Sequence, residues 1–208
     1  MRLTDPALAA ILDREHAAAR AQRGQPRPPQ GDMADFRTSE MHRTRYLSIR
    51  PDQGRWLYAL AVGSGARQIV EFGTSFGIST LYLAAAADET GGMVTGSEFH
   101  PEKAARARQN LSEAGLVADI RVGDARQTLA DPDGPIDLLF LDGAKDLYVP
   151  VLEMLTPRLA PRALVVADNI DPERAEIAGF LDSVAAPGYV TSLLGFGKGG
   201  MSLSLRMA

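Results

Sequence analysis

The sequence predicts an α/β fold with a seven-stranded, mostly parallel sheet, helices on both faces and a C-terminal antiparallel hairpin. From residue 68 onward, short apolar runs alternate with helical patterns, which is typical of parallel strands joined by crossover helices. The last two apolar runs are separated only by GFGKGG, which leaves no room for a helix, so one edge strand should run antiparallel. A length of 208 residues suits one such domain with a sizeable core.

Each strand is predicted from its own apolar run. The parallel strands are expected at 68–72, 93–98, 118–122, 136–141 and 163–168, and the hairpin strands at 189–194 and 201–207. Helices are expected between them at 77–88, 101–114, 124–130, 146–160 and 172–186. The sequence contains no internal repeat.

The chain before the first strand is less regular. Residues 4–22 form an amphipathic pattern, whereas 24–32 has the glycine and proline density of a flexible segment. A further helix should begin at Pro51, since proline is favoured in the first turn. We therefore divide the chain into an N-terminal helix with a flexible or lid segment, 1–46, and a main domain, 47–208.

Composition and charge exclude several classes of function. The net charge of −4 and the pI near 5.4 give no general attraction to nucleic acid or an anionic membrane. The charged N-terminus lacks the apolar core of a signal peptide, and no later run could span a bilayer, so we expect a cytoplasmic protein. The absence of cysteine excludes disulfides and thiolate chemistry.

A glycine-rich loop, EFGTSFGIST (71–80), follows the first strand. Gly73 and Gly77 allow a sharp turn and a close approach of a ligand to the main chain. Ser79 and Thr80 lie in the first turn of the next helix, whose free amides attract an anionic group. The spacing differs from GxGxxG and from GK[ST], so a carboxylate-bearing ligand such as S-adenosylmethionine (SAM) fits better than a dinucleotide or triphosphate. Taken alone, the loop is equally compatible with a tight strand-to-helix turn.

Two further signals follow in the order expected of a nucleoside site. Glu98 ends the second strand, where a carboxylate can accept hydrogen bonds from both ribose hydroxyls. Gly123, Asp124 and Ala125 follow the third strand, where they could contact adenine. Glu98 alone could be only a strand-end carboxylate, but the ordered combination favours a cofactor site.

The fourth and fifth strands also end in carboxylates, Asp142 and Asp168, the latter followed by Asn169. Neighbouring parallel strands bring their carboxyl ends to one edge, so these three oxygen ligands should converge there. An all-oxygen set suits a hard cation such as Mg²⁺. The alternatives are a helix N-cap for Asp142 and a turn for Asp168 and Asn169.

Lysine is scarce in this chain: only Lys103, Lys145 and Lys198 occur among 22 basic residues. Lys145 lies three residues beyond Asp142, and a neighbouring divalent cation would lower its pKa, which makes it a candidate general base. The alternative is a solvated surface lysine. The three histidines do not form a metal-binding set, and surface roles are expected for them.

On these motifs the chain resembles the metal-dependent O-methyltransferases that include catechol and caffeoyl-CoA O-methyltransferases and bacterial relatives. The resemblance covers residues 47–208, from LSIRPDQGRWLYAL through EFGTSFGIST and VGDA, and is most specific at FLDGAKDLY and ADN. It implies a Rossmann-like class I methyltransferase fold, with residues 47–208 as the SAM-dependent domain.

The resemblance also implies roles for individual residues. The methionine end of SAM would be surrounded by Ser48, Glu71, Gly73, Ser75, Gly77 and Ser79. Glu98 would bind the ribose, Asp124 and Ala125 the adenine, and Asp142 would contribute to the cofactor site as well. The metal ligands would be Asp142, Asp168 and Asn169, with Lys145 as base.

The implied reaction is methyl transfer from SAM to one hydroxyl of an ortho-dihydroxy aromatic, with Mg²⁺ orienting the diol. Two features depart from the family: Gly143 and Ala144 stand where animal catechol enzymes carry bulky side chains, and the final hairpin has Lys198 but no carboxylate. Lys198 could pair with an acidic group of the substrate or simply face solvent. We expect no nucleic acid or membrane partner, and the apolar faces of the first helices would allow a homodimer.

Two alternatives remain open from the sequence. One is a nucleotide-binding oxidoreductase, which explains the glycine loop and Glu98 but neither acidic strand end. The other is a noncatalytic SAM-binding partner protein, against which the intact Asp142, Lys145, Asp168 and Asn169 argue.

Overall fold

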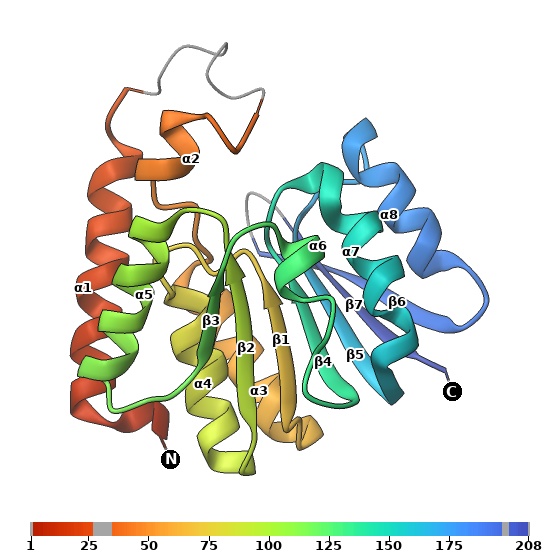
Figure 1. Ribbon diagram of the computed structural model, residues 1–208, viewed down its shortest axis with the longest axis horizontal. Helices are drawn as coiled ribbons and strands as arrows, with labels where there is room; N and C mark the ends of the chain where they lie inside the picture. The colour runs from red at the N-terminus through yellow and green to blue at the C-terminus, as the bar shows by residue number, and fades with distance from the viewer. Residues whose placement is uncertain (1, 27–34, 197–199, 208) are drawn as a thin grey trace.

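A computed structural model describes residues 2–26, 35–196 and 200–207. Its centre is a seven-stranded sheet in the order β3-β2-β1-β4-β5-β7-β6 (Figure 1). The strands are β1 (Gln68–Phe72), β2 (Met93–Glu98), β3 (Asp119–Val122), β4 (Ile136–Leu141), β5 (Leu159–Ile170), β6 (Tyr189–Gly195) and β7 (Gly200–Arg206). Strands β1 to β5 are parallel, and β7 pairs antiparallel with both β5 and β6. The predicted fold class is confirmed.

Strand β5 is longer than its apolar run predicts. Its first residues pair with β4 through Leu159 and Ile136, and the register then shifts before Leu138 meets Leu164. Arg162, with φ of 65°, lies in this irregular stretch. Pro161 and Arg162 interrupt the apolar pattern, which is why the sequence predicts a strand only from residue 163.

The helices form two layers, one on each face of the sheet (Figure 1). They are α1 (Pro6–Arg23), α2 (Glu40–Thr44), α3 (Pro51–Ser64), α4 (Ile78–Thr90), α5 (Pro101–Glu113), α6 (Ala125–Thr128), α7 (Tyr148–Leu155) and α8 (Ala175–Ala185). Short 3₁₀ turns also occur in the described ranges, at η1 (Arg2–Thr4), η3 (Lys145–Leu147) and η4 (Thr156–Arg158). Helices α1, α3, α4 and α5 pack on one face, and α6, α7 and α8 on the other.

The alternation of side chains along each strand separates two cores. In β4, Leu138 and Phe140 enter the core beneath α3 and α4, whereas Leu139 and Leu141 enter the core beneath α7 and α8. Both faces of the central strands are therefore buried, as their near-continuous apolar sequence predicts.

The N-terminal helix belongs to the first of these cores. The apolar face of α1, formed by Leu8, Ile11 and Leu12, is buried within the chain. This face is therefore not available to a second copy, and a homodimer formed through it loses its basis.

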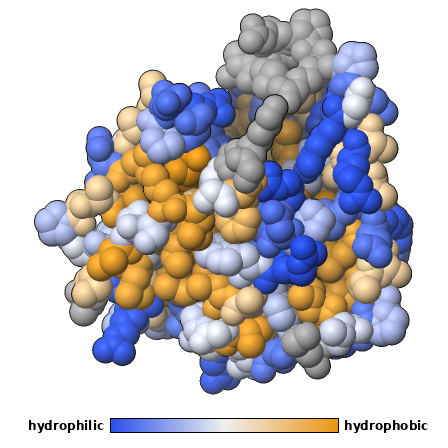
Figure 2. Space-filling view, turned by 180° about the vertical axis from the view of Figure 1, so that it is seen from behind, coloured by the Kyte–Doolittle hydropathy of each residue, from blue (hydrophilic) through white to orange (hydrophobic). Residues whose placement is uncertain are grey.

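The surface outside the two cores is chemically mixed. Seen from behind, hydrophobic residues cover a broad area beside a group of hydrophilic ones (Figure 2). The hairpin contributes exposed apolar side chains, including Val190 and Leu193 of β6. No helix in the described part of the chain combines the length and apolar character needed to cross a membrane.

Candidate active site

A cavity of about 1050 Å³ lies at the carboxyl ends of the parallel strands. This is the edge where open α/β sheets bind their ligands. Its lining includes these predicted site residues: Ser48, Gly73, Ser75, Glu98, Asp124, Ala125, Asp142, Lys145, Asp168 and Asn169. Residues from five strand ends and from the segment before α3 therefore meet in one cavity.

Three of the predicted cofactor residues, Glu71, Gly77 and Ser79, are absent from this lining. The Glu71 side chain is fully buried beneath the glycine loop and accepts hydrogen bonds from the hydroxyls of Thr74, at 2.8 Å, and Thr80. Burial raises the pKa of the Glu71 carboxyl, and hydrogen bonds from neighbouring hydroxyls oppose that shift. In this geometry Glu71 fixes the loop from below.

The glycine loop needs glycine at two positions. Gly73 has a φ of 98°, and a Cβ there would lie 2.6 Å from the carbonyl carbon of Asp142. Gly77 has a φ of 86°, and its Cβ would lie 2.9 Å from the Cβ of Ala107 on α5. The loop is thus pressed between the fourth strand end and α5, which places the predicted cofactor and metal residues side by side.

The Glu98 carboxylate is held in a fixed orientation. It accepts hydrogen bonds from the backbone N–H of Ser75 at 2.7 Å and of His100 at 2.9 Å. Asp124, at the third strand end, caps α6 and pairs with Arg126 at 2.6 Å. The Arg126 guanidinium is the main cause that lowers the pKa of Asp124 to about 2, so this carboxyl is ionised at neutral pH.

Asp142 and Asp168 form an acidic pair at the other end of the cavity. Burial and, secondarily, repulsion by Asp168 raise the pKa of Asp142 well above its ordinary value. Burial also raises the pKa of Asp168. Its Oδ1 accepts a hydrogen bond from Gln53 Nε2 at 2.7 Å, and its Oδ2 from Asn169 Nδ2 at 2.8 Å.

These residues fit a hard divalent cation. Two buried carboxylates that repel each other are stabilised by a cation between them, and their oxygens are the ligands Mg²⁺ prefers. Within the described ranges, no three His, Cys, Asp or Glu side chains group together as a metal site, so an amide oxygen would have to complete the set. Asn169, with a φ of 56° next to Asp168, is the nearest such residue in sequence.

Lys145 lies between the acidic pair and Tyr148. Its Nζ is 3.7 Å from Asp142 Oδ1 and donates hydrogen bonds to the carbonyl oxygen of Gly143, at 3.1 Å, and the hydroxyl of Tyr148, at 2.5 Å. Burial lowers the pKa of Lys145, and the Asp142 carboxylate opposes that shift. The Tyr148 hydroxyl in turn donates to the backbone carbonyl of Asp168 at 3.0 Å.

Sequence reasoning missed two residues that support this end of the site. Tyr148 ends the motif FLDGAKDLY, so the sequence places it near the site, but its contact with Lys145 is not predicted. Gln53 lies 115 positions before the Asp168 carboxylate that it contacts, and nothing in its local sequence distinguishes it from a surface glutamine of α3. Lys198 lies outside the described residues.

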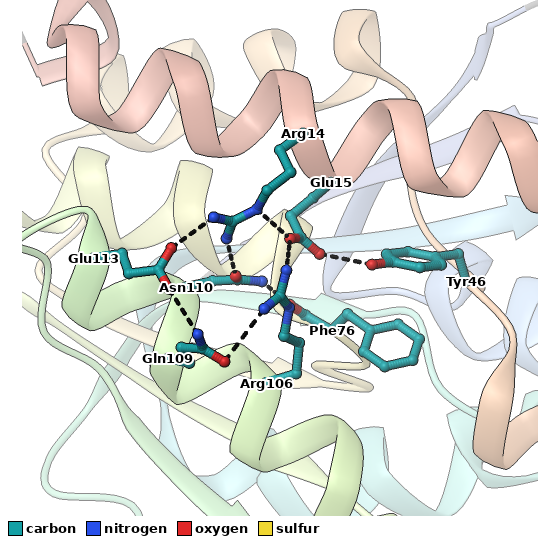
Figure 3. A network of polar contacts seen from close by, with 8 residues as sticks. All are labelled: Arg14, Glu15, Tyr46, Phe76, Arg106, Gln109, Asn110 and Glu113. Atoms are coloured by element: carbon teal, nitrogen blue, oxygen red, sulfur yellow. Dashed lines mark hydrogen bonds and ion pairs between the residues drawn. The ribbon is translucent and has the colours of Figure 1, made fainter.

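An ionic network around the buried Glu15 supports the glycine loop (Figure 3). Glu15 of α1 is fully buried and accepts hydrogen bonds from Arg14, Arg106 and the Tyr46 hydroxyl. The Tyr46 ring stacks on Phe76 of the loop with centroids 4.4 Å apart. Asn110 Nδ2 donates to the Phe76 carbonyl at 2.9 Å. Helices α1 and α5 therefore hold both the loop and Tyr46, which lines the cavity.

Comparison with known proteins agrees with this geometry. Residues 70–170 match the protein family described as a methyltransferase domain. The chain is 32% identical over 130 residues to a catechol O-methyltransferase of Niastella koreensis, covering 60% of this chain and 58% of that protein. It is 38% identical over 128 residues to a catechol O-methyltransferase of Mycobacterium tuberculosis, covering 60% of this chain and 57% of that protein.

The chain therefore resembles the class I O-methyltransferases that include catechol and caffeoyl-CoA O-methyltransferases.

Solved structures extend the likeness to nearly the whole chain. The O-methyltransferase TomG of Streptomyces achromogenes, solved in complex with SAM, has a TM-score of 0.75 at 25% identity and covers 98% of this chain and 91% of its own. A cofactor-bound protein from MTB has a TM-score of 0.73 at 29% identity and covers 97% of this chain and 90% of its own. The curated relatives are matched over only 58% and 57% of their length.

Proposed function

We propose that this protein transfers a methyl group from SAM to one hydroxyl of an ortho-dihydroxy aromatic substrate, with a divalent metal, Mg²⁺, orienting the diol. The observation that carries the proposal is one cavity lined at one end by Glu98 and the glycine loop and at the other by Asp142, Asp168, Asn169 and Lys145. A methyl donor and a metal-bound acceptor need this adjacency. Relatives named catechol O-methyltransferase support the acceptor class.

The cofactor end would bind SAM by shape and by polar contacts. The oriented Glu98 carboxylate would accept hydrogen bonds from the ribose hydroxyls, and Asp124 with Ala125 would contact adenine. Ser48, Gly73 and Ser75 line the region assigned to the methionine end, whereas Glu71, Gly77 and Ser79 would act by shaping the loop. The residues before α3 would cover the bound cofactor.

The acceptor end would bind and deprotonate the diol. Asp142, Asp168 and Asn169 would hold Mg²⁺, which supplies a Lewis acid that lowers the pKa of a bound hydroxyl. Lys145 Nζ would take that proton, since burial disfavours its ammonium form while Gly143 and Tyr148 hold the amine in place. Holding donor and acceptor at near-attack distance in one cavity is worth up to about 7–11 kcal/mol of the barrier.

Product analysis with matched acceptors tests the proposal. The protein, SAM and Mg²⁺ should convert a panel of catechols, including a carboxylated catechol and a hydroxycinnamoyl thioester, to mono-O-methyl products and S-adenosylhomocysteine (SAH). The corresponding monohydroxy phenols, which cannot chelate a metal, should not react. Tight SAM binding without turnover of any ortho-diol would favour the noncatalytic alternative, and NADH binding in a spectral titration would favour the oxidoreductase.

A further inference from the structure

Lys103 of α5 is a buried cation that the proposed reaction does not use. Its side chain lines the cavity with only 2% of the residue exposed. Across the described ranges its Nζ has no hydrogen-bond or ion-pair partner, and it lies 5.1 Å from the ring centroid of Phe76 in the glycine loop. A buried charge without an ionic partner is costly, so its position calls for a ligand that supplies the partner.

The charges around Lys103 show what it faces in the cavity. Burial lowers the pKa of Lys103 to about 8, while the carboxylates of Glu98 and Asp142 oppose the shift. Both carboxylates line the same cavity as Lys103, so the ammonium group lies within electrostatic range of both. At neutral pH it remains mostly protonated.

Other polar atoms in the same part of the cavity also lack partners. Ser48 Oγ, Ser75 Oγ and His42 Nδ1 are buried without a hydrogen-bond partner among the described residues, and all three side chains line the cavity. Ser75 directly precedes Phe76, whose ring lies beneath the Lys103 ammonium group. Burial is the main cause that lowers the pKa of His42, and the charge of Lys103 is the next, so the imidazole lies near Lys103. Buried polar groups are rarely left unpaired, so the cluster suits a ligand with several acceptor oxygens.

We propose that Lys103 Nζ binds the α-carboxylate of the methionine moiety of SAM and of its product SAH. This inference rests on the proposed function, because it names a contact of that cofactor. The methionine end carries the only carboxylate of SAM and is assigned to the glycine loop, where Lys103 lies. At the acceptor end the nearby cations are different ones: the charges of Lys145 and Arg50 act against the burial that raises the pKa of Asp168.

Calorimetric titration of Lys103→Met with two ligands tests the contact. Methionine keeps the length and apolar stem of lysine without its charge. The variant should bind SAH about 30-fold more weakly than the wild type, the cost of leaving a buried carboxylate without its partner. It should bind 5′-methylthioadenosine, which lacks the amino-acid end, within about threefold of the wild type. Removal of an unpaired buried charge should leave the melting temperature of the free protein equal or higher.

Lys145→Met is the matched control, since it removes another buried lysine from the same cavity. Its affinity for SAH should stay within about threefold of the wild type. Equal losses for SAH and 5′-methylthioadenosine in Lys103→Met would overturn the inference, as would equal losses of SAH affinity in both variants. An unchanged SAH affinity with a raised KM for a carboxylated catechol would also overturn it and would assign Lys103 to the acceptor. Failure of the wild type to bind SAH would instead contradict the proposed function.

Discussion

At the scale of single residues, Lys145 is the proposed general base. Its Nζ is held by Gly143 and Tyr148 and lies 3.7 Å from Asp142 Oδ1. We expect Lys145→Met to lower kcat by about 10²- to 10⁴-fold, the usual contribution of a general base. Steady-state assays under saturating SAM measure this loss. A kcat within a few-fold of the wild type would mean that another group, or the metal alone, removes the proton.

Gln53 supports the proposed metal site through its hydrogen bond to Asp168 Oδ1. Loss of such a supporting contact frees the carboxylate to rotate. We therefore expect Gln53→Met to raise the Mg²⁺ concentration needed for half-maximal activity by about 10- to 100-fold, while SAH affinity is unchanged. Titration of activity with Mg²⁺ gives the first quantity and calorimetry the second. Gln109→Met, at an exposed position of α5, is the control. An unchanged Mg²⁺ midpoint would remove Gln53 from the metal site.

The contrast between Lys145 and Gln53 shows which residue roles a sequence can predict. Asp142 and Lys145 share one local motif at a strand end, so the sequence predicts that they lie close together, and the 3.7 Å contact between Lys145 Nζ and Asp142 Oδ1 confirms it. Gln53 and Lys103 act through contacts with residues far along the chain, and helical periodicity assigns them only to a face. Their roles appear only once the helices are packed on the sheet.

At the scale of helices and strands, His16 joins α1 to α4. Its Nε2 lies 3.1 Å from the Tyr82 hydroxyl, and burial lowers the pKa of this histidine to about 4. The unfolded chain, with a histidine pKa near 6.5, therefore binds more protons between these two values, so the free energy of unfolding should fall as pH falls through this window. The expected loss from this residue is about 2 kcal/mol between pH 7.5 and pH 5.

Urea unfolding of the wild type and of His16→Gln at both pH values measures the effect. Glutamine can still hydrogen-bond Tyr82 but does not titrate, so the variant should lose less stability at pH 5 than the wild type. The same pH dependence in both proteins would contradict the burial of a neutral His16.

The packing of the glycine loop against α5 gives a second test at this scale. Gly77→Ala introduces a Cβ at positive φ and 2.9 Å from Ala107, so we expect a loss of about 2–4 kcal/mol in unfolding free energy from backbone strain and crowding together. Gly65→Ala is the matched control, because its φ is 67° but no atom lies within 4 Å. It should lose only about 1 kcal/mol. Equal losses in urea unfolding would mean that the loop does not press on α5.

The same scale shows where element prediction succeeds and where it fails. The apolar runs of β1, β2 and β4 coincide with the observed strands, because each is buried on both faces. The run of β5 begins late because Pro161 and Arg162 lie in an irregular stretch of the ladder. The region 146–160 reads as one helix but contains 3₁₀ turns on both sides of α7, a distinction that periodicity does not resolve.

At the scale of the whole molecule, the order of the strands explains why one sheet can carry both halves of the proposed active site. Strands β1 to β3 bring the glycine loop, Glu98 and Asp124 to one half of the cavity, and β4 with β5 bring Asp142 and Asp168 to the other. The adjacency of β1 and β4 in the middle of the sheet joins the halves. The division of the chain at residue 46 into a covering segment and a catalytic domain remains a prediction.

The central claim is that the acidic pair holds a metal on which methyl transfer depends. The most direct measurement is the rate of SAM-dependent methylation of a catechol with Mg²⁺, after addition of EDTA, and after Mg²⁺ is restored. The rate should vanish with EDTA and return with Mg²⁺, while SAH affinity measured in parallel stays unchanged. A rate that does not change with EDTA would be consistent with the proposed methyl transfer but would contradict the metal site at Asp142 and Asp168.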